Sequence, residues 1–257
     1  MDDTYQIYVN RVAQMTLSAS YAQQLQNIQK SAKFDGGVAV PFPGYTVMTP
    51  PEPEDPVNSE FYNYLKLCQG ELLQHLPPGL LVPIPPASFH VTLADLIWDG
   101  GYRDAVGKNP QFEQELFAHI SESFRQYQAG METSKPIILQ LLGLSIFRRA
   151  LAVCLVPAKE EGYGQIVGLR RSIYQNSGII SLGIDQQYDY TAHVTLGYFG
   201  EIAPQLNRES LGRTLGRLND SWLETEPPVI SIERAQIRKF TDMLNYEREG
   251  DWPVCAL

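Results

Sequence analysis

The same tetrapeptide, His-Val-Thr-Leu, occurs twice in this chain of 257 residues. The copies begin at His90 and at His193, and the chain has only four histidines. At ordinary residue frequencies, a pair among four histidines shares its next three residues by chance in roughly a few cases per thousand. We therefore interpret the repeated segment as a functional motif. The other two histidines, His75 and His119, fall on expected helices without a chemical companion, and we interpret them as structural.

Each copy of the motif alternates polar and apolar residues with the period of a β-strand. His90 and Thr92 should therefore share one face of their strand, and His193 and Thr195 should share one face of theirs. The intervening valines and leucines should point into an apolar core. Two such strands side by side would place two imidazoles and two hydroxyls around one cleft.

This set of groups suits displacement at a phosphodiester. A neutral imidazole can take a proton from the attacking water or hydroxyl, and a protonated imidazole can give one to the leaving alkoxide. Histidine can serve in both roles near neutral pH because its unperturbed pKa is about 6.5. The hydroxyls of Thr92 and Thr195 can donate hydrogen bonds to the non-bridging phosphate oxygens. The scheme requires no metal and no other cofactor, and the sequence does not assign which histidine is the base.

Two tyrosines are further candidates for contacting a substrate. Tyr45 follows a Pro-Gly turn that could place it at the cleft, although a plain turn is the commoner meaning of that dipeptide. Tyr198 lies five residues after His193, so a regular strand turns it to the opposite face, unless a bulge re-aims it. Gly197 should share the face of His193 and leave room for a substrate.

The elements predicted around the motifs give an α+β plan. Apolar residues at helical spacing predict helices near 20–32, 61–76, 112–127, 166–173 and 211–218. Strands are expected near 38–48, 88–94, 137–147, 150–156, 192–198, 229–236 and 243–246. Each half of the chain offers a strand, a helix and then a motif strand, which predicts two lobes related by an approximate repeat. We expect residues 1–35 to form an appended helical arm and 36–257 to form a single bilobal domain.

The composition of the chain limits the kinds of binding partner and the cell compartment that we expect. The formal net charge is −9, which argues against a long duplex nucleic acid but not against a small phosphodiester or nucleotide. The three cysteines are far apart and form no disulfide framework, and the N-terminal residues show no signal-peptide pattern. There is also no long apolar run. We therefore expect a cytoplasmic protein that does not span a membrane.

The paired His-hydrophobic-Thr-hydrophobic (HxT) segments resemble those of the two-histidine (2H) phosphoesterase superfamily. That superfamily includes RNA 2′,5′-ligase-like cyclic phosphodiesterases, plant-type cyclic phosphodiesterases and a nuclear RNA-trimming enzyme. The resemblance covers roughly residues 38–247 in element order. It implies a bilobal α+β fold with antiparallel sheets, packed helices and a cleft between pseudo-symmetric lobes. It also implies metal-free catalysis by His90 and His193, with Thr92 and Thr195 binding the substrate.

The implied activity is hydrolysis of a cyclic nucleotide or RNA-terminal phosphodiester, which would be a step of RNA processing. The sequence departs from the ligase-like branch after the second motif, where a basic residue is common and Gly197-Tyr198-Phe199 stands here. This departure indicates a divergent branch. Two alternatives stay open. One is a non-catalytic module that binds nucleotides or RNA ends, and the other is a metal site that adds Asp95 or Asp189 to the two histidines.

Overall fold

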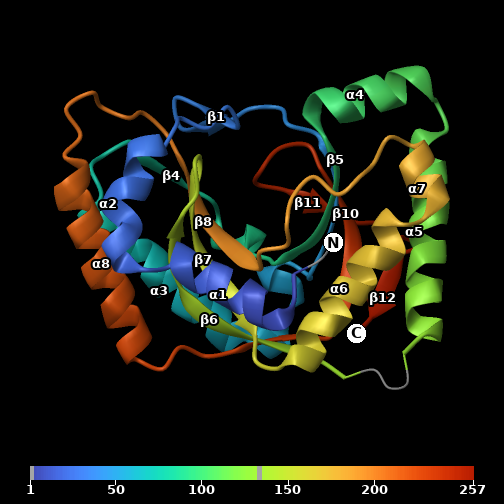
Figure 1. Cartoon of the computed structure of the whole chain (residues 1–257). Helices are drawn as coiled ribbons and strands as arrows, with labels where there is room; N and C mark the ends of the chain where they lie inside the picture. The colour runs from blue at the N-terminus through green and yellow to red at the C-terminus, as the bar shows by residue number, and fades with distance from the viewer. Residues whose placement is uncertain (1–2, 132–134) are drawn as a thin grey trace.

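Two antiparallel five-stranded sheets form the frame of the molecule (Figure 1). The computed structural model describes residues 3–131 and 135–257. The first sheet has the order β11-β10-β3-β5, with β12 also pairing with β10. Its strands are β3 (Gly44–Met48), β5 (Thr92–Trp98), β10 (Arg234–Phe240), β11 (Tyr246–Glu247) and β12 (Val254–Ala256).

The second sheet has the order β4-β8-β7-β6-β9. Its strands are β4 (Leu81–Pro83), β6 (Ile137–Ile146), β7 (Ala150–Pro157), β8 (His193–Phe199) and β9 (Ile230–Ile232). A separate two-stranded hairpin joins β1 (Phe34–Asp35) to β2 (Val38–Ala39).

The helices are divided between the two sheets. Figure 1 shows one group beside the second sheet: α2 (Tyr21–Gln24), α3 (Ser59–His75) and α8 (Arg208–Glu224). A second group lies beside the first sheet: α4 (Asp99–Lys108), α5 (Phe112–Ala129) and α7 (Ser177–Ser181). The remaining helices, α1 (Tyr5–Met15) and α6 (Glu160–Tyr174), lie between these groups. Among the described residues, no helix has both the length and the apolar character needed to cross a membrane.

The expected bilobal α+β fold is confirmed, but the lobes do not follow the two halves of the chain. β4 precedes the first motif, yet it pairs with β8 of the second sheet through Leu81 and Phe199. β9 and β10 are consecutive in the chain but belong to different sheets, because the C-terminal segment returns to pair with β3. Each sheet is therefore built from strands of both halves of the chain.

The N-terminal residues are packed into the core. The predicted helix at 20–32 is replaced by the short α2 flanked by 3₁₀ turns, and α1 was not predicted. Tyr8 and Tyr21 are fully buried, and their hydroxyls donate to the carbonyls of Leu155 in β7 and Leu144 in β6. Residues 1–2 of the predicted arm lie outside the described part of the chain. Residues 3–35 therefore support the second sheet directly.

The strand predicted at 88–94 begins later, at Thr92. Residues Pro86–Ser88 form a 3₁₀ turn, so His90 lies in the connection that leads into β5. His193, in contrast, is the first residue of β8. The prolines before the first motif explain this difference, because proline has no backbone N–H to donate to a strand partner.

Candidate active site

The two motif histidines are anchored in the same way. Nδ1 of His90 donates to the carbonyl of Ser88 at 2.7 Å, and Nδ1 of His193 donates to the carbonyl of Thr191 at 2.8 Å. A carbonyl can only accept, so the proton of each neutral ring lies on Nδ1. Nε2 of each ring is then left with a lone pair that can accept a proton from a reacting group, or with a proton to give after the ring has been charged.

The alternation expected within each motif is present in the structure. The threonines, Thr92 and Thr195, are half-buried, as are the two histidines. The intervening apolar side chains are fully buried: Val91, Leu93, Val194 and Leu196. Each motif therefore presents one imidazole and one hydroxyl on a support of packed side chains.

A β-bulge follows each motif and changes the face of the residues after it. In β8, Thr195 pairs with Ala152 and Gly197 pairs with Leu151, so Leu196 is the extra residue. In β5, Thr92 pairs with Met48 and Ala94 pairs with Val47, which leaves Leu93 as the extra residue. An extra residue shifts the alternation by one position. The residue five places after each histidine, Asp95 or Tyr198, is therefore brought to the histidine face.

The bulge in β8 settles the expectations for Gly197 and Tyr198. Tyr198 is half-buried on the histidine face, whereas Gly197 is buried. A Cβ at Gly197 would lie 2.8 Å from Cγ of Leu81 and 2.8 Å from the carbonyl oxygen of Val82. The expectation that Gly197 leaves room for a substrate is therefore wrong, because its missing side chain makes room for β4.

A buried side chain donates to the carbonyl of each bulged leucine. Nη1 of Arg170 in α6 donates to the carbonyl of Leu93 at 2.7 Å. Nε2 of Gln69 in α3 donates to the carbonyl of Leu196 at 2.7 Å and to that of Ile84 at 2.8 Å. An unpaired buried carbonyl is costly, so these contacts stabilise the bulged form of both strands.

A charge on His193 acts on His90, so the two rings lie within electrostatic range of each other. Burial lowers the pKa of His90 to about 4, and a charge on His193 contributes to that shift. Burial also lowers the pKa of His193, but the carboxylate of Asp95 offsets part of that effect. Tyr246 from β11 packs its ring 4.4 Å from the ring of His90, centroid to centroid, and Phe147 packs 5.0 Å from the ring of His193.

Sequence reasoning missed Phe147 of the β6–β7 hairpin and Tyr246 of β11, because no motif marks them. It also missed Lys33 of the N-terminal segment, whose positive charge acts on both histidines. Asp95 had been considered only as a metal ligand. One signal in the sequence could have marked it: Asp95 lies five residues after His90, as Tyr198 lies five residues after His193.

Tyr45 is not gathered with the histidines. It is 1% exposed, and its hydroxyl donates to Glu113 of α5 at 2.9 Å. Its ring packs against Tyr102 and Phe117 on the side of the first sheet that the helices cover. Its neighbour Thr46 points the other way, as alternation along β3 requires. We therefore leave Tyr45 out of the candidate site.

The other two histidines lie on helices, as expected. Nδ1 of His75 lies 2.8 Å from the carbonyl of Glu71 in its own helix, and His119 lies 3.8 Å from Glu122 in α5. Within residues 3–131 and 135–257, no group of three or more His, Cys, Asp or Glu side chains is arranged to hold a metal ion.

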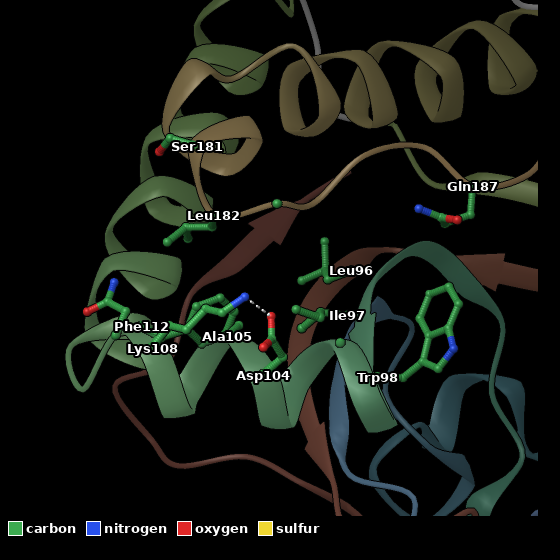
Figure 2. Close-up of a pocket in the computed structure, with 13 residues that line it drawn as sticks. Leu96, Ile97, Trp98, Asp104, Ala105, Lys108, Phe112, Ser181, Leu182 and Gln187 are labelled. Carbon is green, nitrogen blue, oxygen red and sulfur yellow. Dashed lines mark hydrogen bonds and ion pairs between the residues drawn. The ribbon is translucent and has the colours of Figure 1, made fainter.

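A pocket of about 530 Å³ lies at the far end of β5, away from both motifs. Figure 2 shows Leu96, Ile97 and Trp98 at its base and the ion pair between Lys108 and Asp104 along one side. Neither a histidine nor a motif threonine lines it. The pocket is therefore separate from the candidate active site.

Solved structures with a similar fold are known, whereas no family model and no curated protein matches the sequence. A conserved protein of unknown function from Agrobacterium tumefaciens is 18% identical. Its alignment covers 90% of this chain and 96% of that chain, with a TM-score of 0.61. At this identity the likeness shows a shared fold.

Two 2H phosphoesterases are also among the similar structures. LigT from E. coli, solved with 3′-AMP, is 12% identical over 84% of this chain and 95% of LigT, with a TM-score of 0.43. TT0787 from Thermus thermophilus is 15% identical over 83% of this chain and 94% of that chain, also with a TM-score of 0.43. The resemblance to the 2H phosphoesterases rests on the paired His-Val-Thr-Leu motifs.

Proposed function

We propose that this protein is a metal-independent phosphoesterase that hydrolyses a cyclic nucleotide or an RNA-terminal phosphodiester. The observation that carries the proposal is the paired anchoring of His90 and His193. Both rings fix their proton on Nδ1 and leave Nε2 for chemistry, and a charge on His193 acts on His90. A histidine with only a structural role would need neither a second histidine nor the same Nδ1 hydrogen bond in both motifs.

The surroundings of the two rings assign their roles. His90 is the general base, because its pKa of about 4 keeps it neutral at pH 7. Burial lowers the pKa of His193, but the carboxylate of Asp95 opposes that shift, an effect not found at His90, so we assign His193 as the general acid. Nε2 of His90 takes a proton from water while the water oxygen bonds to phosphorus. The bond from phosphorus to the ribose oxygen breaks, and His193 gives that oxygen its proton.

The threonines complete the scheme. Charge builds up on the non-bridging oxygens as the displacement proceeds, and hydrogen-bond donors aimed at them lower the barrier. Thr92 and Thr195 lie two residues after their histidines and are half-buried like them, which supports this donating role for their hydroxyls. Tyr198 adds a third hydroxyl on the β8 side.

The test is a screen of the purified protein against nucleoside 2′,3′-cyclic phosphates and short RNAs with cyclic phosphate ends. We expect hydrolysis that EDTA does not reduce, and a bell-shaped pH profile. Saturable nucleotide binding without product after long incubation would instead favour a binding module. Loss of activity on adding EDTA, restored by a metal, would contradict the metal-free mechanism.

A further inference from the structure

The segment that carries Lys33 is fastened to the C-terminal end of β8, beyond the second motif. The N–H of Ser31 donates to the carbonyl of Phe199 at the end of β8, at 2.8 Å. The N–H of Lys33 donates to Oγ of Ser31 at 3.2 Å, and its carbonyl accepts from the N–H of Val40 at 3.1 Å. This segment therefore delivers a lysine from the N-terminal region to the end of a strand that begins with His193.

Two aromatic rings hold the Lys33 side chain. Its Nζ lies 4.8 Å from the centroid of Tyr198 and 4.9 Å from the centroid of Phe42. Nζ also donates to the hydroxyl of Tyr198 at 3.3 Å. Cation–π contacts attract an ammonium without neutralising it. The two rings and the hydroxyl of Tyr198 thus hold the Lys33 ammonium in place, and its charge remains available to bind an anion.

No carboxylate pairs with Lys33 among the residues that the structure describes. Lys159, the other lysine without a carboxylate partner in that part of the chain, is exposed, whereas Lys33 is half-buried. The remaining lysines form ion pairs with Asp or Glu: Lys30, Lys66, Lys108, Lys135 and Lys239. Lys33 is therefore a half-buried cation that no carboxylate neutralises, in a chain with a net charge of −9.

The other cation near His90 is already neutralised. Arg238 is 2% exposed and makes a bidentate contact with the carboxylate of Glu54, one arm of which is 2.9 Å long. Its guanidinium also donates to the side chain of Gln236 and the carbonyl of Tyr246. Lys33, in contrast, keeps its charge for the site. Burial has the largest effect on the pKa of each of three groups: it lowers the pKa of His90 and of His193 and raises that of Asp95. The positive charge of Lys33 acts to lower all three values, so these groups lie within its field.

We propose that Lys33 binds a non-bridging oxygen of the phosphate group placed between His90 and His193. This inference rests on the proposed function and adds a binding residue to it. An ammonium is a compact point charge that suits a phosphate oxygen. Because the negative charge on these oxygens grows during displacement, Lys33 stabilises the transition state more than the bound substrate.

The experiment titrates inorganic phosphate into the wild type, Lys33→Met, Lys33→Arg and the control Lys30→Met. Lys30 is the matched control because it lies in the same segment but is paired with Glu201 and Asp35 on the surface. The four histidines permit ring-nitrogen NMR, which reports phosphate binding and the pKa of each ring together. Turnover of a cyclic nucleotide is measured in parallel.

We expect Lys33→Met to weaken phosphate binding about tenfold, which corresponds to about 1.4 kcal/mol. The same change should raise the pKa of both His90 and His193, because a nearby positive charge is removed. Lys33→Arg should retain part of the affinity, and Lys30→Met should match the wild type. With a substrate that turns over, Lys33→Met should also lower kcat, since a transition-state contact is lost.

Equal phosphate affinity in Lys33→Met and the wild type would overturn the inference, as would the absence of phosphate binding to the wild type. Should Lys33→Met fail to fold, Lys33→Gln replaces it, with thermal unfolding as the check. A wild type that binds phosphate through Lys33 but hydrolyses no phosphodiester would contradict the proposed function and leave the anion site standing.

Discussion

The two motif strands have the same backbone plan and different electrostatic surroundings. In both, a histidine donates from Nδ1 to the carbonyl two residues earlier, and a bulge follows at the leucine. The residue that each bulge brings to the histidine face differs: Asp95 in β5 and Tyr198 in β8. The carboxylate of Asp95 acts against burial to raise the pKa of His193, and it is not among the groups that act on His90. The duplicated backbone thus positions two identical imidazoles, and we propose that their different neighbours make one the base and the other the acid.

The largest expected effect comes from removing either histidine. His90→Ala and His193→Ala should each lower kcat/KM by about 10³-fold or more, in the upper range for a lost proton-transfer group. Both variants should keep the wild-type circular dichroism spectrum, because both rings are half-buried. His75→Ala, on the exposed surface of α3, is the control and should retain full activity. Full activity in one of the two motif variants would show that the two motifs do not contribute equally to catalysis.

The two side chains that donate to the bulged strands should contribute different amounts to the stability of the protein. Arg170→Met leaves the carbonyl of Leu93 unpaired, and Gln69→Leu does the same to that of Ile84 while removing a bond to Leu196. Each should lower the free energy of unfolding by about 1–3 kcal/mol in urea titrations.

Arg170→Met should be the more costly of the two, because its guanidinium also lies over two tyrosine rings, those of Tyr174 and Tyr190. Ser172→Ala, on the same helix, is the control. A stability equal to that of the wild type in either variant would show that the bulge does not depend on its side-chain donor.

Asp95→Asn tests the electrostatic asymmetry. Removing the carboxylate should lower the pKa of His193, because a negative charge that favours the protonated ring is lost. Less His193 is then protonated at pH 7, so kcat should fall about tenfold. The limb of the pH profile that reports the acid should move to lower pH, while the limb of the base stays in place. A shift of the base limb instead would reverse the assigned roles.

The smallest expected effect belongs to Tyr198→Phe. The ring remains over Lys33, but the hydroxyl that donates to Sδ of Met243 at 3.4 Å is lost. We expect a decrease of about two- to threefold in kcat/KM, within the range of one neutral hydrogen bond. Tyr174→Phe is the control, since its hydroxyl donates to the Asp95 carbonyl outside the histidine face. A loss in Tyr198→Phe as large as that in a histidine variant would make Tyr198 a proton-transfer group.

The sequence predicted the features that depend on local periodicity. The alternation of His193, Val194 and Thr195 along the second motif follows from strand geometry, and the burial confirms it. Most of the helix and strand plan after residue 59 follows the spacing of apolar residues. The sequence does not predict α4, which contains two adjacent glycines and shows no apolar stripe, nor the short elements β4, α7 and β12. The strand expected at 229–236 is divided into β9 and β10.

The features that sequence could not predict depend on contacts between distant segments. The face of Tyr198 depends on a bulge whose extra leucine is capped by Gln69 of another helix. The role of Gly197 depends on the approach of β4, and the position of Lys33 depends on a hydrogen bond to Phe199. None of these pairings leaves a local pattern. The sequence shows that Asp95 and Tyr198 each lie five residues after a motif histidine. Only the bulges in the structure show that both residues share the face of their histidine.

The measurement that tests the central claim most directly is a double-mutant cycle on a nucleoside 2′,3′-cyclic phosphate in the presence of EDTA. Two groups that transfer protons in one step act as a unit. We therefore predict that His90→Ala/His193→Ala loses no more rate than either single variant. A loss in the double variant equal to the product of the two single losses would contradict the claim that the imidazoles work on one phosphate.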